Sequence, residues 1–196
     1  MSLIACFTAL KNETLNQIVQ KKLDKWKLAE SGDAIVSLHE TVKALSQQVS
    51  EGGDGKWETR DEIALDIASN EGRQECVDRA WHAIHYTLTY QTADALLPLG
   101  FIMNGGQALP GEYEGSEPRG FSSDDTKAIA EALDAITDDY FRARYDAKAL
   151  RDQEIYPDLD WADADIKDYV ADHFLSLRDF LSFCANHEMG MLVTLN

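Results

Sequence analysis

The 196-residue sequence predicts an α+β fold: one helix-dominated domain over residues 1–196 with a small sheet. Two observations carry this prediction. Most of the chain has apolar residues spaced three and four apart, which is typical of amphipathic helices. Residues 3–10 and 191–195 are instead short apolar runs, so we expect the N- and C-terminal runs to pair as strands of one sheet. Residues 100–103 are a candidate for a further strand.

The first 70 residues should contribute three helices. Asn12 is a suitable N-cap for a helix that reaches about Ala29, with apolar residues on one side. A second amphipathic helix is expected over residues 33–49, before the glycines of 51–55 break the chain. A short helix is expected over residues 61–69.

The rest of the chain predicts a helix over about residues 75–90, and then an irregular segment, 95–121, that is rich in glycine and proline. Ser122 and the acids that follow it favour a helix start, and we expect that helix to reach Arg144. A short helix over 146–153 and a long helix over 163–186 precede the last strand.

Charge is distributed unevenly along the chain. Residues 1–60 are neutral, whereas the remainder carries the whole formal net charge of −17. Such a surface repels nucleic-acid phosphates and anionic lipids, so neither nucleic acid nor membrane is an expected partner. It would attract a basic protein, although an acidic surface also simply favours solubility.

The three cysteines are Cys6, Cys76 and Cys184, each in an apolar context and without a CxxC pair. We therefore expect buried free thiols and a reducing, cytoplasmic compartment, with neither a disulfide framework nor a zinc ribbon. The sequence shows no signal-peptide pattern and no apolar stretch of membrane-spanning length.

One segment concentrates residues with possible chemistry. His82 and His85 are three apart and should share a helix face, which Asp78 could join. Together with Trp81 and the loop cation Arg119, they are the candidate ligand-binding residues of a cleft covered by residues 98–121. Hydrogen-bonded structural histidines are the simpler interpretation, and Arg119 could pair either with a local carboxylate or with an anionic ligand.

Other motifs do not predict a metal or cofactor. The acids between Asp158 and Asp165 lack the glycine and the closing glutamate of an EF-hand loop, so an acidic helix start is expected instead. Gly105 and Gly106 do not form a phosphate-binding motif.

Several segments together resemble a known family. The run VDRAWHAIHY over 77–86 is similar to the pattern D-K-x-W-H-x-L-H-F of the YfbM-like family, domain of unknown function 1877. The order of the apolar opening near Ile4, the helix start over 118–125, and the run EIYP over 154–157 also agrees with that family. The likeness is close over about 75–196 and weaker over 12–74. It implies an α+β domain in the bacterial cytoplasm, and no established activity, cofactor or catalytic residue.

Two function classes remain open on the sequence. The first is an acidic protein-interaction domain that binds a basic partner, as immunity proteins do for basic toxins. The second is an enzyme or small-ligand-binding protein that uses the cleft around Asp78, His82, His85 and Arg119. The first is preferred because the sequence assembles no catalytic set.

Overall fold

The computed structural model describes residues 3–20, 65, 67–109 and 116–195, and it confirms the α+β fold. Five antiparallel strands form one sheet in the order β2-β1-β5-β4-β3. The predicted terminal strands, β1 (Ala5–Leu10) and β5 (Gly190–Leu195), are neighbours at its centre, with Ala5 opposite Leu195 and Leu10 opposite Gly190. Three short strands extend the sheet outward: β2 (Gln74–Cys76), β4 (Arg119–Phe121) and β3 (Gln107–Ala108).

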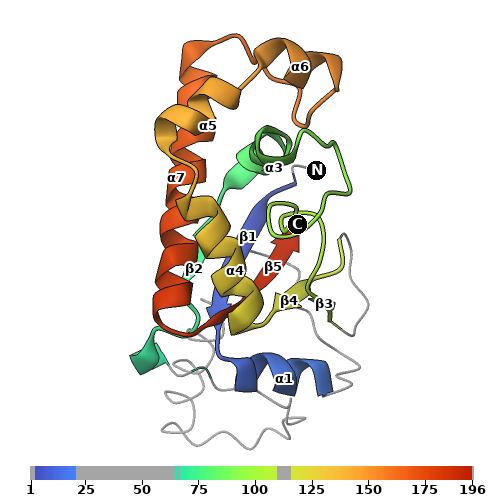
Figure 1. Cartoon of the computed structure of the whole chain (residues 1–196). Coiled ribbons are helices and arrows are strands. Elements are labelled where there is room, and N and C mark those ends of the chain that lie inside the picture. Colours follow the sequence, from blue (N-terminus) through green and yellow to red (C-terminus); the bar gives the residue numbers. More distant parts are fainter. Residues whose placement is uncertain (1–2, 21–64, 66, 110–115, 196) are drawn as a thin grey trace, which may run out of the picture.

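Helices cover both faces of the two central strands, every residue of which is buried. On one face, α4 (Ser123–Asp134) and α7 (Ala164–Asn186) lie side by side against the sheet, as Figure 1 shows. Phe7 and Val193 join the main core on this side. On the other face, Leu10 and Leu192 form a smaller core with Leu15 and Ile18 of α1 (Asn12–Gln20).

The remaining helices lie at the opposite end of the sheet from α1 (Figure 1). They are α3 (Trp81–Thr89), α5 (Asp138–Arg144) and α6 (Ala147–Asp152). The main core continues between α5 and α7, where the rings of Phe141 and Phe174 stack with centroids 4.0 Å apart. Short 3-10 turns occupy Ile67–Ser69 (η1) and Asp78–Ala80 (η2).

The predicted helix starts at Ser122 and Asp163 are confirmed. The hydroxyl of Ser122 accepts from the amide of Asp125, and the Asp125 carboxylate accepts from the Ser122 amide, which makes a capping box for α4. Asp163 caps α7 by accepting from the amide of Asp165. The acids around this point therefore form a helix start, as predicted.

Two predicted helices are wrong in extent. The helix expected over 75–90 begins only at Trp81, because residues 74–76 pair with β1 as an edge strand. The helix expected from Ser122 to Arg144 is two helices, α4 and α5. The break falls where the hydroxyl of Thr137 accepts from the amide of Tyr140 and starts a new helix.

The candidate strand at residues 100–103 is also wrong. These residues form a turn in which Phe101 and Ile102 are fully buried. Gly100 allows the turn to close, because a Cβ there would lie 2.3 Å from the carbonyl oxygen of Ala95.

The expectation of three free thiols is correct only for Cys184, which is buried and unbonded. Cys6 and Cys76 form a disulfide between β1 and β2. They are 70 residues apart in sequence, and only the antiparallel pairing of the two strands brings them opposite each other.

Some predictions fall outside the described residues. The helix expected over 12–29 is present as α1 up to Gln20, and residues 21–29 are not described. The helix expected over 33–49 and the turn at 51–55 are likewise not described. Of the short helix expected over 61–69, the structure shows the 3-10 turn at 67–69. Among the helices described, none combines the length and the hydropathy of a membrane span.

Candidate functional site

His82 is held by structural contacts on both ring nitrogens. Its Nδ1 accepts from the amide of Tyr156 at 3.0 Å, so its Nε2 carries the proton and donates to the carbonyl of Thr92 at 2.8 Å. The ring stacks on Trp81, with centroids 4.9 Å apart. Burial lowers the pKa of His82, which favours the neutral ring that this bonding requires.

His85 is fully buried on the inner side of the same helix. Its Nε2 lies 2.7 Å from the carbonyl oxygen of Ala93, whereas its Nδ1 has no protein partner. Burial is the largest cause that lowers its pKa, and the positive charge of Arg119 lowers the pKa further. Both histidines therefore tie the chain that follows α3 back onto that helix.

The other predicted residues also make structural contacts. Asp78 accepts from the hydroxyl of Tyr169 at 3.0 Å, so it is drawn towards α7 and does not orient either imidazole. The indole of Trp81 donates to the carbonyl of Leu3 at 3.2 Å. Arg119 was expected to meet a carboxylate or an anionic ligand, but its guanidinium donates to three main-chain carbonyls, those of Phe101, Ile102 and Gly105.

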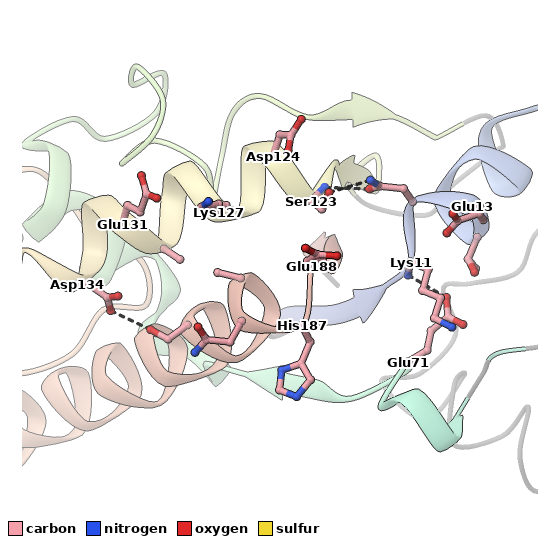
Figure 2. A pocket seen from close by; sticks show the side chains of 16 residues that line it. Lys11, Glu13, Glu71, Ser123, Asp124, Lys127, Glu131, Asp134, His187 and Glu188 are labelled. Atoms are coloured by element: carbon pink, nitrogen blue, oxygen red, sulfur yellow. Dashed lines mark hydrogen bonds between the residues drawn. The ribbon is translucent and has the colours of Figure 1, made fainter.

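A large hollow lies elsewhere, and none of those five residues lines it. It has a volume of about 1130 Å³. One wall is a face of α4, a second is the C-terminal end of α7, and the start of α1 with the turn at 70–72 closes one end (Figure 2). The hollow is therefore built from segments that are distant in sequence.

Most of the charged side chains that line the hollow are acidic. Exposed carboxylates come from three elements: Glu13 of α1, Asp124, Glu131 and Asp134 of α4, and Glu188 after α7. The α4 residues follow helical spacing, with Lys127 among them, so they share one face. Lys11 and Lys127 are the lysines of the lining, and Ser182 donates to Asp134 at 2.8 Å. The carboxylates outnumber the lysines, so the hollow carries negative charge.

Hydrogen bonds fix the end of the hollow where two helices begin. The side-chain amide of Asn12 donates to the hydroxyl of Ser123 at 2.8 Å, and its oxygen accepts from the Ser123 amide at 2.9 Å. Glu71, which is buried, accepts from the main-chain amide of Lys11 at 2.9 Å. These bonds hold the starts of α1 and α4 at a set separation.

Glu188 has an unusual backbone conformation for a residue with a side chain. Its φ is +54°, in the left-handed region that normally favours glycine after a helix. The amide of the next residue, Met189, donates to the carbonyl of Cys184 and closes the helix end. A carboxylate is thus displayed towards the hollow at a position where glycine would be more stable.

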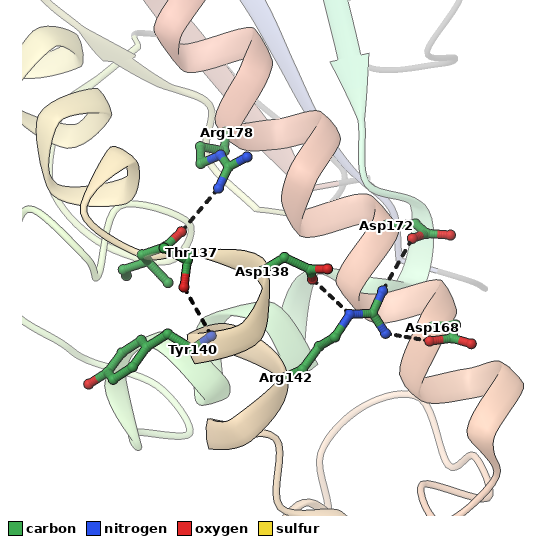
Figure 3. A network of polar contacts seen from close by, with 8 residues as sticks. Thr137, Asp138, Tyr140, Arg142, Asp168, Asp172 and Arg178 are labelled. Atoms are coloured by element: carbon green, nitrogen blue, oxygen red, sulfur yellow. Dashed lines mark hydrogen bonds and ion pairs between the residues drawn. The ribbon is translucent and has the colours of Figure 1, made fainter.

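A second group of acids, between α5 and α7, is paired instead. Arg142 contacts the carboxylates of Asp138 (2.7 Å), Asp168 and Asp172 (3.6 Å), as Figure 3 shows. Lys148 pairs with Asp152 within α6. Part of the acidic segment of the sequence therefore has a structural role in joining helices.

The hollow could not be found by reading motifs, because it combines the acidic face of α4 with residues that are distant in sequence. Among the residues that the structure describes, no three His, Cys, Asp or Glu side chains lie close enough together to hold a metal ion.

The five-stranded sheet with its covering helices defines an α+β protein with an acidic surface hollow. The chain belongs to the family of the domain of unknown function DUF1877, whose model matches residues 1–194. Its structure is similar to the crystal structure of YfbM from Escherichia coli, a protein of unknown function, with a TM-score of 0.59 and 16% sequence identity. That match covers 98% of this chain and 99% of YfbM. A comparison with curated proteins gives no match.

Proposed function

We propose that this protein is an acidic protein-interaction domain that binds a basic partner protein in the hollow between α1, α4 and α7. The observation that carries this proposal is the gathering of exposed carboxylates from three elements around one concavity of about 1130 Å³. A Lys or Arg side chain of a partner could enter such a hollow and meet several carboxylates at once.

The charge of the whole chain supports the same partner. With a net charge of −17, the protein would attract a basic surface from a distance, and complementary charge chiefly raises the association rate and the specificity. Neutralisation of a basic toxin, as an immunity protein performs, is one form that this function can take. A cytoplasmic location is part of the proposal.

The acids of the hollow are better candidates for a docking site than those between α5 and α7. Arg142 already lies among three of the latter, so a partner would have to displace an internal cation to reach them. Glu13, Asp124 and Glu131 are exposed at the hollow and are not used in this way.

The alternative, an enzyme or a small-ligand binder around the histidines, has less support. A general base needs a ring nitrogen that can reach substrate. Both nitrogens of His82 are bonded to main-chain groups, and His85 is fully buried with one nitrogen bonded to a carbonyl. Asp78 bonds Tyr169 instead of an imidazole.

The experiment compares two triple variants of the full chain that have the same net charge. One replaces hollow acids, Glu13→Gln, Asp124→Asn and Glu131→Gln. The other replaces exposed acids that do not line the hollow, and consists of Asp139→Asn, Asp158→Asn and Asp179→Asn. Calorimetry at 0.15 M salt measures the affinity of each for a peptide of alternating lysine and arginine.

We expect the hollow variant to bind more weakly by about 3- to 150-fold, since each exposed charge pair contributes about 0.2–1 kcal/mol. The control should change much less, because charges more than about 8 Å away are largely screened at this salt concentration. Equal losses in the two variants would mean that the peptide responds to net charge alone, and the proposed site would be wrong.

A further inference from the structure

The edge strand β2 is joined to β1 by a disulfide at one end. At its other end, the preceding residues are hydrogen-bonded to β1 and lead to the hollow. Cys76 is bonded to Cys6 on β1, and the three residues 74–76 pair with β1 in register. Towards the hollow, the amide of Gly72 donates to the carbonyl of Ala9 at 2.8 Å, and the amide of Ala9 donates to the carbonyl of Arg73. Segment 71–76 therefore runs along β1 from the hollow to the disulfide.

Glu71 begins this segment and lines the hollow. Its carboxylate accepts from the amide of Lys11, the residue that joins β1 to α1. Glu71 thus helps to hold the start of α1, together with the Asn12–Ser123 bonds, and so contributes to the place of Glu13 on the hollow wall.

Among the described residues, side chains also link the segment to its neighbours, and the side-chain amide of Gln74 donates to the hydroxyl of Thr8 at 3.4 Å. A three-residue edge strand has a short ladder, and the exposed side chain of Arg73 stacks on Phe183 of α7 at 4.1 Å. The disulfide is the one covalent restraint that the described part of the chain shows here. Loss of a covalent link at the end of a short edge strand should let the segment open locally.

We propose that the Cys6–Cys76 disulfide is a reversible redox switch that regulates the acidic hollow by ordering segment 71–76. This inference rests on the proposed function for its binding effect, whereas its effect on the segment stands alone. If the protein is cytoplasmic, a disulfide there is expected to be transient and redox-sensing.

The chemistry is thiol–disulfide exchange with a low-molecular-weight thiol and its disulfide. In reduction, a thiolate attacks the sulfur of Cys76, the more exposed of the two residues, and the Cys6 thiolate leaves. A second thiol then resolves the mixed disulfide, so that two external thiols become one external disulfide while the protein gains two thiols. The disulfide forms again by the reverse reaction, in which one external disulfide is reduced to two thiols while the two protein thiols are oxidised.

The test compares the oxidised full chain with the chain reduced by dithiothreitol. Hydrogen exchange, read by mass spectrometry on peptides that cover residues 70–77, should become about tenfold faster or more on reduction. Exchange in α4 should stay unchanged. The affinity for the lysine–arginine peptide should fall about tenfold, which corresponds to the loss of one well-placed charged contact.

Variants separate this pair from the remaining cysteine. The double variant Cys6→Ser/Cys76→Ser should behave like the reduced chain, and the reduced wild type provides the same comparison if that variant does not fold. Cys184→Ser should retain the full redox response, since Cys184 takes no part in the disulfide.

The outcomes separate the two proposals. Unchanged exchange over 70–77 in a chain whose thiols are shown to be reduced would overturn the switch. Faster exchange with equal peptide affinity in both forms would overturn its control of the hollow. Faster exchange with no peptide binding in either form would contradict the proposed function while supporting the switch.

Discussion

Glu188 offers a test in which stability and binding should change in opposite directions. It follows α7 with a φ of +54° and lines the hollow. In Glu188→Gly, the left-handed conformation is no longer unfavourable, but the hollow loses a carboxylate. We therefore expect a more stable protein that binds a basic peptide less tightly.

The magnitudes follow from the backbone conformation. A side chain in the left-handed region destabilises the folded state by about 1–2 kcal/mol, and glycine removes this cost. Glycine also makes the unfolded chain more flexible, which lowers the free energy of unfolding by about 0.4–1 kcal/mol. The net gain in the free energy of unfolding is about 0.5–1 kcal/mol, which raises Tm by about 1–4 °C for a chain of this size. The loss of one exposed carboxylate should weaken peptide binding about two- to fivefold.

Glu154 provides a matched control. It is also an exposed glutamate in the left-handed region, with a φ of +52°, immediately after α6. The amide of the following residue, Ile155, donates back to the carbonyl of Leu150, just as Met189 does to Cys184. Glu154→Gly therefore makes the same change in charge and backbone, away from the hollow.

Thermal unfolding and peptide calorimetry on both variants complete the comparison. Both should gain similar stability, and only Glu188→Gly should lose affinity. A loss of affinity of the same size in both variants would show that the peptide does not distinguish the hollow from the rest of the surface. A loss of stability in Glu188→Gly would show that its side chain makes a stabilising contact that outweighs the backbone effect.

Three further predictions concern structural roles. Arg142→Met should lower the free energy of unfolding by about 1–2 kcal/mol at low salt, because three partly exposed carboxylates lose their cation. The loss should be smaller at about 1 M salt, which screens the ion pairs. Chemical denaturation measures both values, and a loss that does not depend on salt would contradict the role of the ion pairs. Burial lowers the pKa of His82, His85 and His173 below the ordinary value near 6.5, so the unfolded chain binds protons at a higher pH than the folded chain. Their contribution to stability should therefore be complete above about pH 7 and should be lost as the pH falls from about 7 to about 5.5. A urea midpoint that does not change over this range would refute it. Burial raises the pKa of Cys184 to about 12, so iodoacetamide should modify this thiol at pH 8 only after denaturation, and rapid labelling of the native chain would show that the site opens.

Local patterns were sufficient to predict the long elements. The terminal strands, the caps at Ser122 and Asp163, and the final helix all follow from residues within a few positions of one another. One boundary that failed depends on pairing with a distant part of the chain, whereas the break between α4 and α5 depends on a local cap, Thr137, that the sequence analysis missed. Residues 74–76 form a strand because β1 lies beside them, although their sequence also suits a helix.

The candidate sites also differ in how far the local sequence could predict them. The motif around His82 and His85 is conspicuous in the sequence, and the histidines bond to the loop eight to ten residues further on. The disulfide joins cysteines that are 70 residues apart, and the hollow combines residues from both ends of the chain, so spacing in the sequence did not predict either of them. Net charge indicated that a basic partner was reasonable but could not separate the acids paired with Arg142 from those of the hollow.

The most direct measurement of the central claim is an NMR titration of the full chain with the lysine–arginine peptide. We expect backbone amide shifts to change most at the residues around the hollow, in particular Glu13, Asp124, Glu131 and Glu188, and little along α5 and α6. Changes that centre on α5 and the N-terminal half of α7, or that spread evenly over all exposed acids, would contradict it.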